Sequence, residues 1–157
     1  MIVKSLDHLN LISQKISAKL SKDDCIFLVG RIGVGKTTLT RFIINNLQRK
    51  KGLKPTEVLS PTFNLLYEYD IKDIKIMHYD LYRLKKGNEL DQLGIFLDDN
   101  DTIKIIEWPE LITTYLKNKL EIHIDYGKKT DEREIKMVGF GKWKNFENEF
   151  KIKKNFR

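Results

Sequence analysis

One stretch of the sequence has the residue types and the spacing that bind phosphate groups. Residues 30–37 read Gly-Arg-Ile-Gly-Val-Gly-Lys-Thr, which matches the phosphate-loop (P-loop, or Walker A) pattern Gly-x-x-x-x-Gly-Lys-Ser/Thr. The glycines allow a tight turn whose backbone N–H groups point inward and form a nest for phosphate oxygens. Lys36 would neutralise the β- and γ-phosphates, and the hydroxyl of Thr37 would ligate Mg²⁺. At ordinary residue abundances the pattern matches by chance at roughly 4 in 100,000 start positions, so it predicts a nucleotide site.

The segments on either side of this loop are predicted to position it. Residues 25–29 form an uninterrupted apolar run, which is typical of a strand buried on both faces of a parallel sheet. Residues 37–51 predict a helix with apolar side chains on one side, and Gly52 is placed to cap its end. The start of this helix would add the positive end of its dipole to the phosphate site.

The remainder of the chain is predicted to supply further strands and helices. Apolar side chains recur at helical spacing over 5–20 and 89–97, and Pro109 opens a further predicted helix that continues to Leu116. Strands are predicted over residues 65–69, 74–79, 103–106, 120–126 and 134–140. The sequence therefore predicts an α/β fold: a P-loop NTPase-like, mostly parallel sheet flanked by helices, with antiparallel strands at its edge.

A phosphate loop that works with Mg²⁺ also needs carboxylates, because Mg²⁺ is a hard cation that prefers oxygen ligands. Asp80 follows the predicted strand 74–79, and Glu107 follows the strand 103–106. Ligands of parallel sheets bind outside the carboxyl ends of the strands, so parallel pairing would bring Asp80, Glu107 and Thr37 to one rim. Either acid could hold the metal while the other orients a water molecule, and this argument does not choose between them. The alternative for each is a helix cap or a surface acid.

Length and composition limit the classes of protein that fit. The chain has 157 residues and a mass of 18.6 kDa, which is about one domain, with 41% apolar and 32% charged residues. Its longest apolar run has five residues, against the ~20 needed to cross a bilayer. No apolar secretory signal is recognised at the N-terminus, and a single cysteine fits a reducing compartment. We therefore expect a cytoplasmic protein without a membrane segment.

The C-terminal residues differ from the preceding sequence. Residues 142–157 contain six basic and two acidic side chains, so they hold +4 of the net charge of +7. Trp143, Phe146 and Phe150 follow at three- and four-residue spacing, which predicts a helix with an aromatic stripe and a basic back. We expect one P-loop domain over residues 1–141 and a basic aromatic extension over 142–157. The extension is interpreted either as a terminal helix that covers the sheet or as a contact with RNA or a partner.

Several short strings after the phosphate loop resemble one family when they are taken together. They are Ser60-Pro61-Thr62-Phe63, residues 78–84 (His-Tyr-Asp-Leu-Tyr-Arg-Leu), Glu89-Leu90 with Leu93-Gly94, residues 105–109 (Ile-Ile-Glu-Trp-Pro) and residues 122–126 (Ile-His-Ile-Asp-Tyr). With the loop, they resemble the TsaE (YjeE) family, the bacterial P-loop ATPase of tRNA threonylcarbamoyladenosine biosynthesis. The resemblance covers about residues 5–140.

This resemblance implies a function. It implies a cytoplasmic protein that binds ATP and Mg²⁺ and assists the TsaB–TsaD pair, which places a threonylcarbamoyl group on tRNA. Hydrolysis would be slow without those partners and would reset them between turnovers. The protein would meet tRNA through that complex, and neither a membrane nor DNA is an expected partner. The choice of ATP over GTP rests on this resemblance, because no Asn-Lys-x-Asp string of the GTPase type is present.

The resemblance also implies roles for individual residues. Thr62 resembles a switch-type threonine near the γ-phosphate, Asp80 a second-switch acid required for activity, and Glu107 the Walker-B-like Mg²⁺ ligand. The expected catalytic residues are Lys36, Thr62, Asp80 and Glu107, and the expected metal ligands are Thr37 and Glu107. The expected nucleotide-binding residues are Gly30, Gly33, Val34, Gly35, Lys36, Thr37, Thr38 and Trp108.

Two other functions on the same scaffold stay open at this point. A small-molecule kinase usually brings an arginine-rich lid over the phosphates, but residues 82–94 contain one arginine, Arg83. A regulatory subunit could instead sense nucleotide without hydrolysing it. Arg83 is expected either to reach the phosphates or to form a structural salt bridge, and Arg31 either to point to solvent or to contact a partner. His78 is expected to be a strand residue with a satisfied hydrogen bond.

Overall fold

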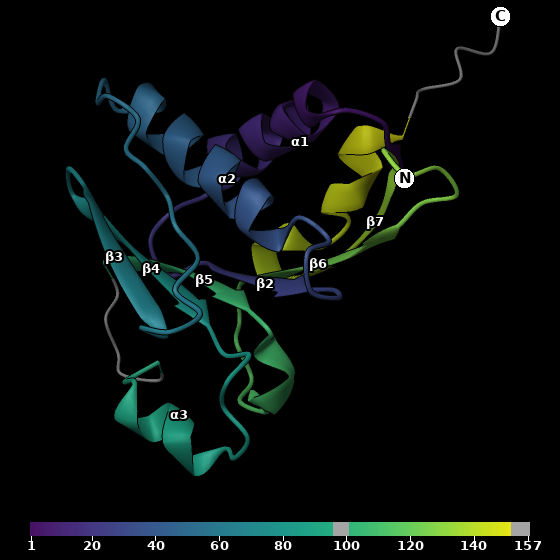
Figure 1. The fold of residues 1–157 in the computed structure, drawn as a ribbon. Coiled ribbons are helices and arrows are strands. Elements are labelled where there is room, and N and C mark those ends of the chain that lie inside the picture. The colour runs from purple at the N-terminus through teal and green to yellow at the C-terminus, as the bar shows by residue number, and fades with distance from the viewer. Residues whose placement is uncertain (96–100, 152–157) are drawn as a thin grey trace, which may run out of the picture.

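The chain folds around one seven-stranded sheet, seen in a computed structural model that describes residues 1–95 and 101–151 (Figure 1). The strand order is β1-β7-β6-β2-β5-β4-β3. The strands are β1 (Ile2–Val3), β2 (Cys25–Val29), β3 (Leu66–Ile71), β4 (Ile74–Asp80), β5 (Thr102–Glu107), β6 (Lys119–Tyr126) and β7 (Arg133–Phe140). The inner strands β6, β2, β5 and β4 are parallel, whereas β3, β7 and β1 each pair antiparallel with their inner neighbour. The predicted fold class is therefore confirmed.

The two long helices cover one face of this sheet. Helices α1 (Leu6–Lys19) and α2 (Lys36–Lys50) lie side by side there, while α3 (Asn88–Gln92) lies on the opposite side (Figure 1). Strand β2 alternates between the two layers: Ile26 and Leu28 belong to the cluster under α1 and α2, and Phe27 belongs to the opposite cluster. Burial on both faces explains why the sequence of β2 is apolar throughout.

Local signals fix the ends of both long helices. The hydroxyl of Ser5 accepts a hydrogen bond from the backbone N–H of His8, which caps the start of α1. Helix α2 begins after Gly35 (φ +117°) and is followed by Gly52 (φ +75°), both in the left-handed region that favours glycine. The bounds predicted for these two helices are correct to within one residue at each end.

The structure differs from the sequence prediction after β5. The helix predicted over 109–116 is one 3₁₀ turn, η1 (Pro109–Leu111). Ile112, Thr113 and Thr114 are β-branched and disfavour the helical conformation, so the chain continues without a regular element. The helix predicted over 89–97 is the shorter α3, and its last two predicted positions lie outside the described residues. The two-residue strand β1 was not predicted.

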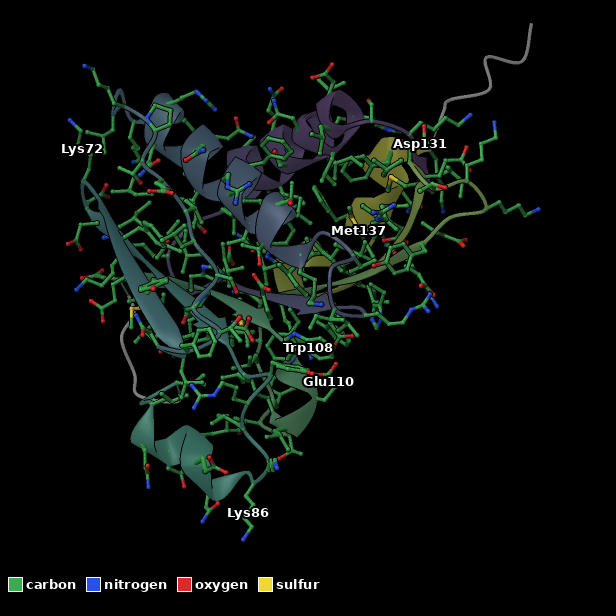
Figure 2. The ribbon with its side chains drawn as sticks, viewed as in Figure 1. Lys72, Lys86, Trp108, Glu110, Asp131 and Met137 are labelled. Carbon is green, nitrogen blue, oxygen red and sulfur yellow. The ribbon has the colours of Figure 1, made fainter. Side chains whose placement is uncertain are left out.

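Two turns lie away from the centre of the sheet, at opposite ends of the molecule (Figure 2). Lys72, whose φ is +58°, occupies the tight turn between β3 and β4, and Lys86 lies before α3 at the outer end of its segment (Figure 2). Trp108 and Glu110 instead lie close together where β5 leads into η1 (Figure 2). Among the described residues, no helix has both the length and the apolar character that spanning a membrane requires.

The aromatic residues of the C-terminal segment pack into the main core. The segment forms two 3₁₀ turns, η2 (Gly141–Trp143) and η3 (Phe146–Phe150), in place of the predicted helix. Trp143 is 0% exposed and Phe146 is 1% exposed, and their rings meet edge to face at 5.0 Å. Lys142 forms an ion pair with the buried Asp24. A hydrogen bond from Lys142 Nζ to the carbonyl oxygen of Lys19 attaches the segment to α1, and its buried rings belong to the same core cluster as the sheet. A contact of the tail with tRNA or a partner stays a prediction.

We expect Trp143→Ala to lower the free energy of unfolding by about 3–5 kcal/mol, because it removes a fully buried aromatic side chain and leaves a cavity. Phe146→Ala should behave similarly. Tyr115→Ala is the control, since Tyr115 is 80% exposed and its replacement should change stability by less than about 0.5 kcal/mol. Denaturant unfolding followed by circular dichroism measures all three. Equal stabilities for the Trp143 and Tyr115 variants would contradict the packing described here.

Candidate functional site

The loop over residues 30–37 lies between the end of β2 and the start of α2, as its motif predicts. Gly33 and Gly35 have φ values of +74° and +117°, so their conformation suits residues without a Cβ. A Cβ at Gly30 would lie 2.4 Å from the carbonyl oxygen of Ile124, so only glycine allows the loop to approach β6 this closely. The sequence requirement for glycine therefore has a physical cause at all three positions.

Lys36 is held within this loop. Its Nζ donates to the carbonyl oxygens of Gly30 at 2.5 Å and Arg31 at 2.9 Å, and it lies 4.1 Å from the ring centroid of Trp108. Burial lowers the pKa of Lys36, and this effect is opposed by the negative charges of Glu107 and Asp80. The ammonium group therefore lies beside the cavity, and the nearby carboxylates partly offset its positive charge.

The parallel pairing of the central strands brings the two predicted acids together. Leu28 of β2 pairs with Glu107 of β5, and Glu107 pairs in turn with Asp80 of β4. Both acids are therefore at the same level, at the carboxyl ends of their strands, and both are buried. Thr37 Oγ1 lies 2.9 Å from Glu107 Oε1 and 3.1 Å from Oε2, so the hydroxyl donates to this carboxylate. The predicted rim of Thr37, Asp80 and Glu107 is present.

His78 makes a second contact with Glu107. Its Nε2 lies 2.9 Å from Glu107 Oε1, and the imidazole is completely buried. Because a carboxylate only accepts hydrogen bonds, this contact places a proton on Nε2. The predicted hydrogen bond of His78 exists, but its partner could not be read from the sequence, since residues 78 and 107 meet only through the pairing of β4 with β5.

Asp80 holds the segment that follows α2. Its Oδ2 accepts from Ser60 Oγ at 3.1 Å and from Thr62 Oγ1 at 3.0 Å, and these two hydroxyls lie 2.8 Å apart. Its Oδ1 accepts from the backbone N–H of Tyr82 at 3.0 Å. Ser60 was not among the predicted site residues, although it opens the Ser-Pro-Thr-Phe string that contains Thr62.

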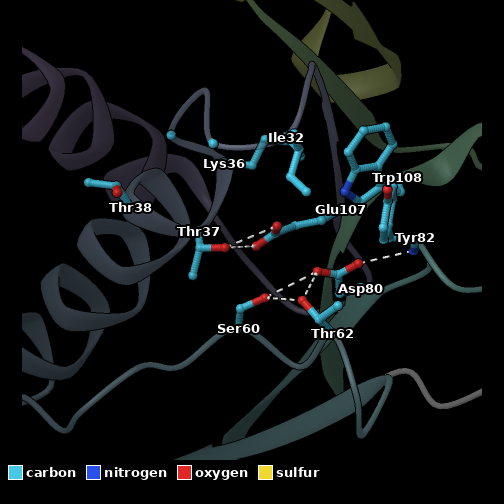
Figure 3. A pocket seen from close by; sticks show the side chains of 12 residues that line it. Ile32, Lys36, Thr37, Thr38, Ser60, Thr62, Asp80, Tyr82, Glu107 and Trp108 are labelled. Carbon is cyan, nitrogen blue, oxygen red and sulfur yellow. Dashed lines mark hydrogen bonds between the residues drawn. The ribbon is translucent and has the colours of Figure 1, made fainter.

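These groups surround one cavity of about 280 Å³, where Thr37 faces Glu107 and where Ser60 and Thr62 face Asp80 (Figure 3). Of the predicted site residues, those that line it are Gly33, Gly35, Lys36, Thr37, Thr38, Thr62, Asp80, Glu107 and Trp108. Gly30 and Val34 do not line it: Gly30 packs against Ile124, and Val34 borders a neighbouring cavity.

The arginines considered from the sequence point elsewhere. Arg83 Nη1 donates to the carbonyl oxygen of Phe63 at 2.8 Å. Within residues 1–95 and 101–151, it neither lines the cavity nor pairs with a carboxylate. Arg31 pairs with Asp125 at 2.8 Å, and both side chains are about two-thirds exposed. This ion pair lowers the pKa of Asp125 below its usual range.

The oxygen donors around the cavity suit Mg²⁺ better than a metal ion whose ligands are all protein side chains. No group of three or more His, Cys, Asp or Glu side chains within 1–95 and 101–151 is arranged to hold a metal ion. Mg²⁺ is usually bound by one or two protein oxygens, with water and phosphate oxygens completing its octahedron. Thr37 and Glu107, whose oxygens are 2.9 Å apart, provide such a pair beside a phosphate loop.

The fold and the loop place the chain in the class of P-loop α/β proteins. A family model described as "Threonylcarbamoyl adenosine biosynthesis protein TsaE" matches residues 3–135, and the chain belongs to this family.

Curated relatives agree with this assignment, and one solved structure shares the fold. A relative from Rickettsia felis, named tRNA threonylcarbamoyladenosine biosynthesis protein TsaE, is 33% identical over 126 residues, which is 80% of this chain and 71% of the relative. A protein of the same name from Haemophilus influenzae is 36% identical over 115 residues, 72% of this chain and 68% of that protein. The crystal structure of Bacillus subtilus YdiB has a similar fold, with a TM-score of 0.70, 24% identity, and coverage of 96% and 90% of the two chains.

We expect the double variant Ser60→Ala, Thr62→Val to release the segment around residue 61, because both hydrogen bonds to Asp80 Oδ2 are lost. At about 1 kcal/mol for each bond, amide hydrogen exchange in residues 60–65 should rise roughly fivefold or more. Exchange within α2 serves as the internal reference and should stay as in the wild type. Unchanged protection of residues 60–65 would mean that Asp80 does not hold this segment.

Proposed function

We propose that this protein is a Mg²⁺-dependent ATPase that assists the formation of threonylcarbamoyladenosine in tRNA. Family membership supports a role in this pathway, since the matched family and its curated relatives are named for threonylcarbamoyladenosine biosynthesis. The observation that carries the ATPase proposal is the convergence of Lys36, the Thr37–Glu107 pair and Asp80 on one cavity beside the phosphate loop. This arrangement offers cationic and amide groups to a triphosphate and carboxylates to its metal.

The proposed reaction is attack of water on the γ-phosphorus. A bond forms between the water oxygen and phosphorus as the bond to the β–γ bridging oxygen breaks, which yields ADP and phosphate. Thr37 and Glu107 would hold Mg²⁺, which when bound neutralises charge on the β- and γ-phosphate oxygens. Lys36 would exchange its carbonyl partners for phosphate oxygens. Asp80, fixed by Ser60 and Thr62, would orient the attacking water.

A second cavity beside the first supports the proposal that the ligand includes a nucleoside. It has a volume of about 310 Å³ and shares Gly33, Gly35 and Thr38 with the phosphate cavity. Its apolar walls are formed by Val3, Leu6, Leu9, Val34, Ile124 and Ile135. An apolar cavity with a few polar groups suits a base and a sugar that continue from phosphates near Thr38. The choice of adenine rests on family membership.

The partners follow from the same proposal. We infer that the protein acts in the cytoplasm with the TsaB–TsaD pair, that hydrolysis is weak without this pair, and that ATP turnover resets the complex. tRNA would be met through the complex. The kinase alternative is less well supported, because Arg83 contacts Phe63 and α3 has five residues, so no arginine-rich lid covers the cavity within the described residues.

We expect ATP hydrolysis to be slow for the protein alone and faster with the TsaB–TsaD pair. Glu107→Ala should lower kcat by on the order of 100-fold, since the loss of a metal ligand removes several kcal/mol of charge stabilisation. Lys36→Ala should weaken ATP binding itself. Glu110→Ala is the matched control: it is an exposed acid three residues further on, and its turnover should match that of the wild type. Phosphate release and tRNA modification are measured for each variant.

The other outcomes separate the alternatives. Transfer of phosphate to an added small molecule, instead of release to water, would favour a kinase. Normal tRNA modification by Glu107→Ala, together with loss of modification by Lys36→Ala, would favour a sensor that binds nucleotide without needing turnover.

A further inference from the structure

The outer side of the phosphate loop is bonded to the hairpin formed by β6 and β7. Tyr126 is the last residue of β6 and Arg133 the first of β7, and the two are direct cross-strand partners. The hydroxyl of Tyr126 donates to the carbonyl oxygen of Ile32 at 3.2 Å. Arg133 Nε donates to the carbonyl oxygen of Val34 at 2.9 Å. Two donors from one hairpin therefore bond alternate peptide groups of the loop.

Both side chains are themselves held in place. The guanidinium of Arg133 lies 4.7 Å from the ring centroid of Tyr126, and that of Arg31 lies 5.0 Å from the same centroid. Arg133 Nη1 also donates to the carbonyl oxygens of Thr130 at 3.0 Å and Glu132 at 2.9 Å. Arg133 thus uses separate nitrogens to bind its own hairpin and the phosphate loop, which only the planar fork of arginine allows.

The geometry of the peptide bond relates these contacts to the cavity. In a planar trans peptide, the C=O of one residue and the N–H of the next point in opposite directions. A donor that holds the Ile32 carbonyl outward therefore turns the Gly33 N–H inward. In the same way, the bond from Arg133 to the Val34 carbonyl turns the Gly35 N–H inward. Gly33 and Gly35 both line the phosphate cavity and both have positive φ, so their peptides need an external constraint to keep one orientation.

We propose that Tyr126 and Arg133 are positioning residues that orient the Gly33 and Gly35 amides toward the phosphates. This inference rests on the proposed nucleotide function and adds to it the groups that pre-organise the loop. Because the constraint is present before the ligand arrives, it acts on the binding of the diphosphate and the triphosphate alike. It does not act on the chemical step, since neither side chain lines the phosphate cavity. Arg133 also lines the second cavity, so the Tyr126 variant is the one that separates loop positioning from contact with the nucleoside.

The test uses Tyr126→Phe, which removes one hydroxyl, and Arg133→Lys, which keeps the charge but loses Nε. We expect each variant to raise the dissociation constants of MgADP and MgATP about three- to tenfold, as for one lost hydrogen bond, with kcat at saturating ATP within about twofold of the wild type. Tyr126→Phe should raise the dissociation constants of ADP, GDP and inorganic tripolyphosphate by the same factor, because the hydroxyl contacts only the loop. Calorimetry measures binding, and thermal unfolding without nucleotide verifies that the variants are folded.

The control is Asp125→Asn, which weakens the exposed Arg31–Asp125 ion pair of the same hairpin and loop. Its nucleotide affinity should equal that of the wild type. The proposal is overturned if folded Tyr126→Phe binds nucleotide normally, or if kcat falls while affinity is kept. Full affinity in Arg133→Lys with loss in Arg133→Gln would also overturn it, because charge alone would then be enough. A wild-type protein that binds no nucleotide would instead refute the proposed function, and this inference with it.

Discussion

The parallel pairing of β2 with β5 and of β5 with β4 is the constraint on which the rest of the site depends. It fixes Leu28, Glu107 and Asp80 at one level, so the loop that follows β2 begins beside both acids. A slip of one residue in this register would turn each side chain to the other face of the sheet. Such a slip would also move Ile26 and Leu28 from the cluster under α1 and α2 to the opposite cluster, and Phe27 the other way. The packing of both clusters therefore opposes it.

Burial of charged groups at this rim is stabilised by hydrogen bonds. Glu107 accepts from Thr37 and His78, and Asp80 accepts from Ser60 and Thr62. A buried carboxylate without such partners would be costly, so the hydroxyls and the imidazole are part of the site. The same bonds connect α2, β4 and the segment before β3. A ligand that replaces one of these hydrogen bonds with a bond to itself would therefore change how these elements are connected.

Local signals predicted most of the fold, and the failures have physical causes. The apolar run of β2, the Ser5 cap and the Gly52 end are short-range features, and the elements that they predict are present. The helix predicted from Pro109 failed because the β-branched residues that follow it disfavour helix. The predicted C-terminal helix is instead two 3₁₀ turns, which are separated by Asn145 in the left-handed region (φ +63°).

The sequence by itself determined the phosphate loop, its strand and helix, and two acids at the ends of strands, since each depends on residues close together in the chain. Only the tertiary structure decided that His78 contacts Glu107, that Ser60 shares Asp80 with Thr62, and that the β6–β7 hairpin holds the loop carbonyls. The two bonds from the hairpin join residues that are far apart in the sequence: Tyr126 and Ile32 are separated by 94 positions, and Arg133 and Val34 by 99. Such pairs are created by the order of the strands in the sheet, which no local pattern of side chains encodes.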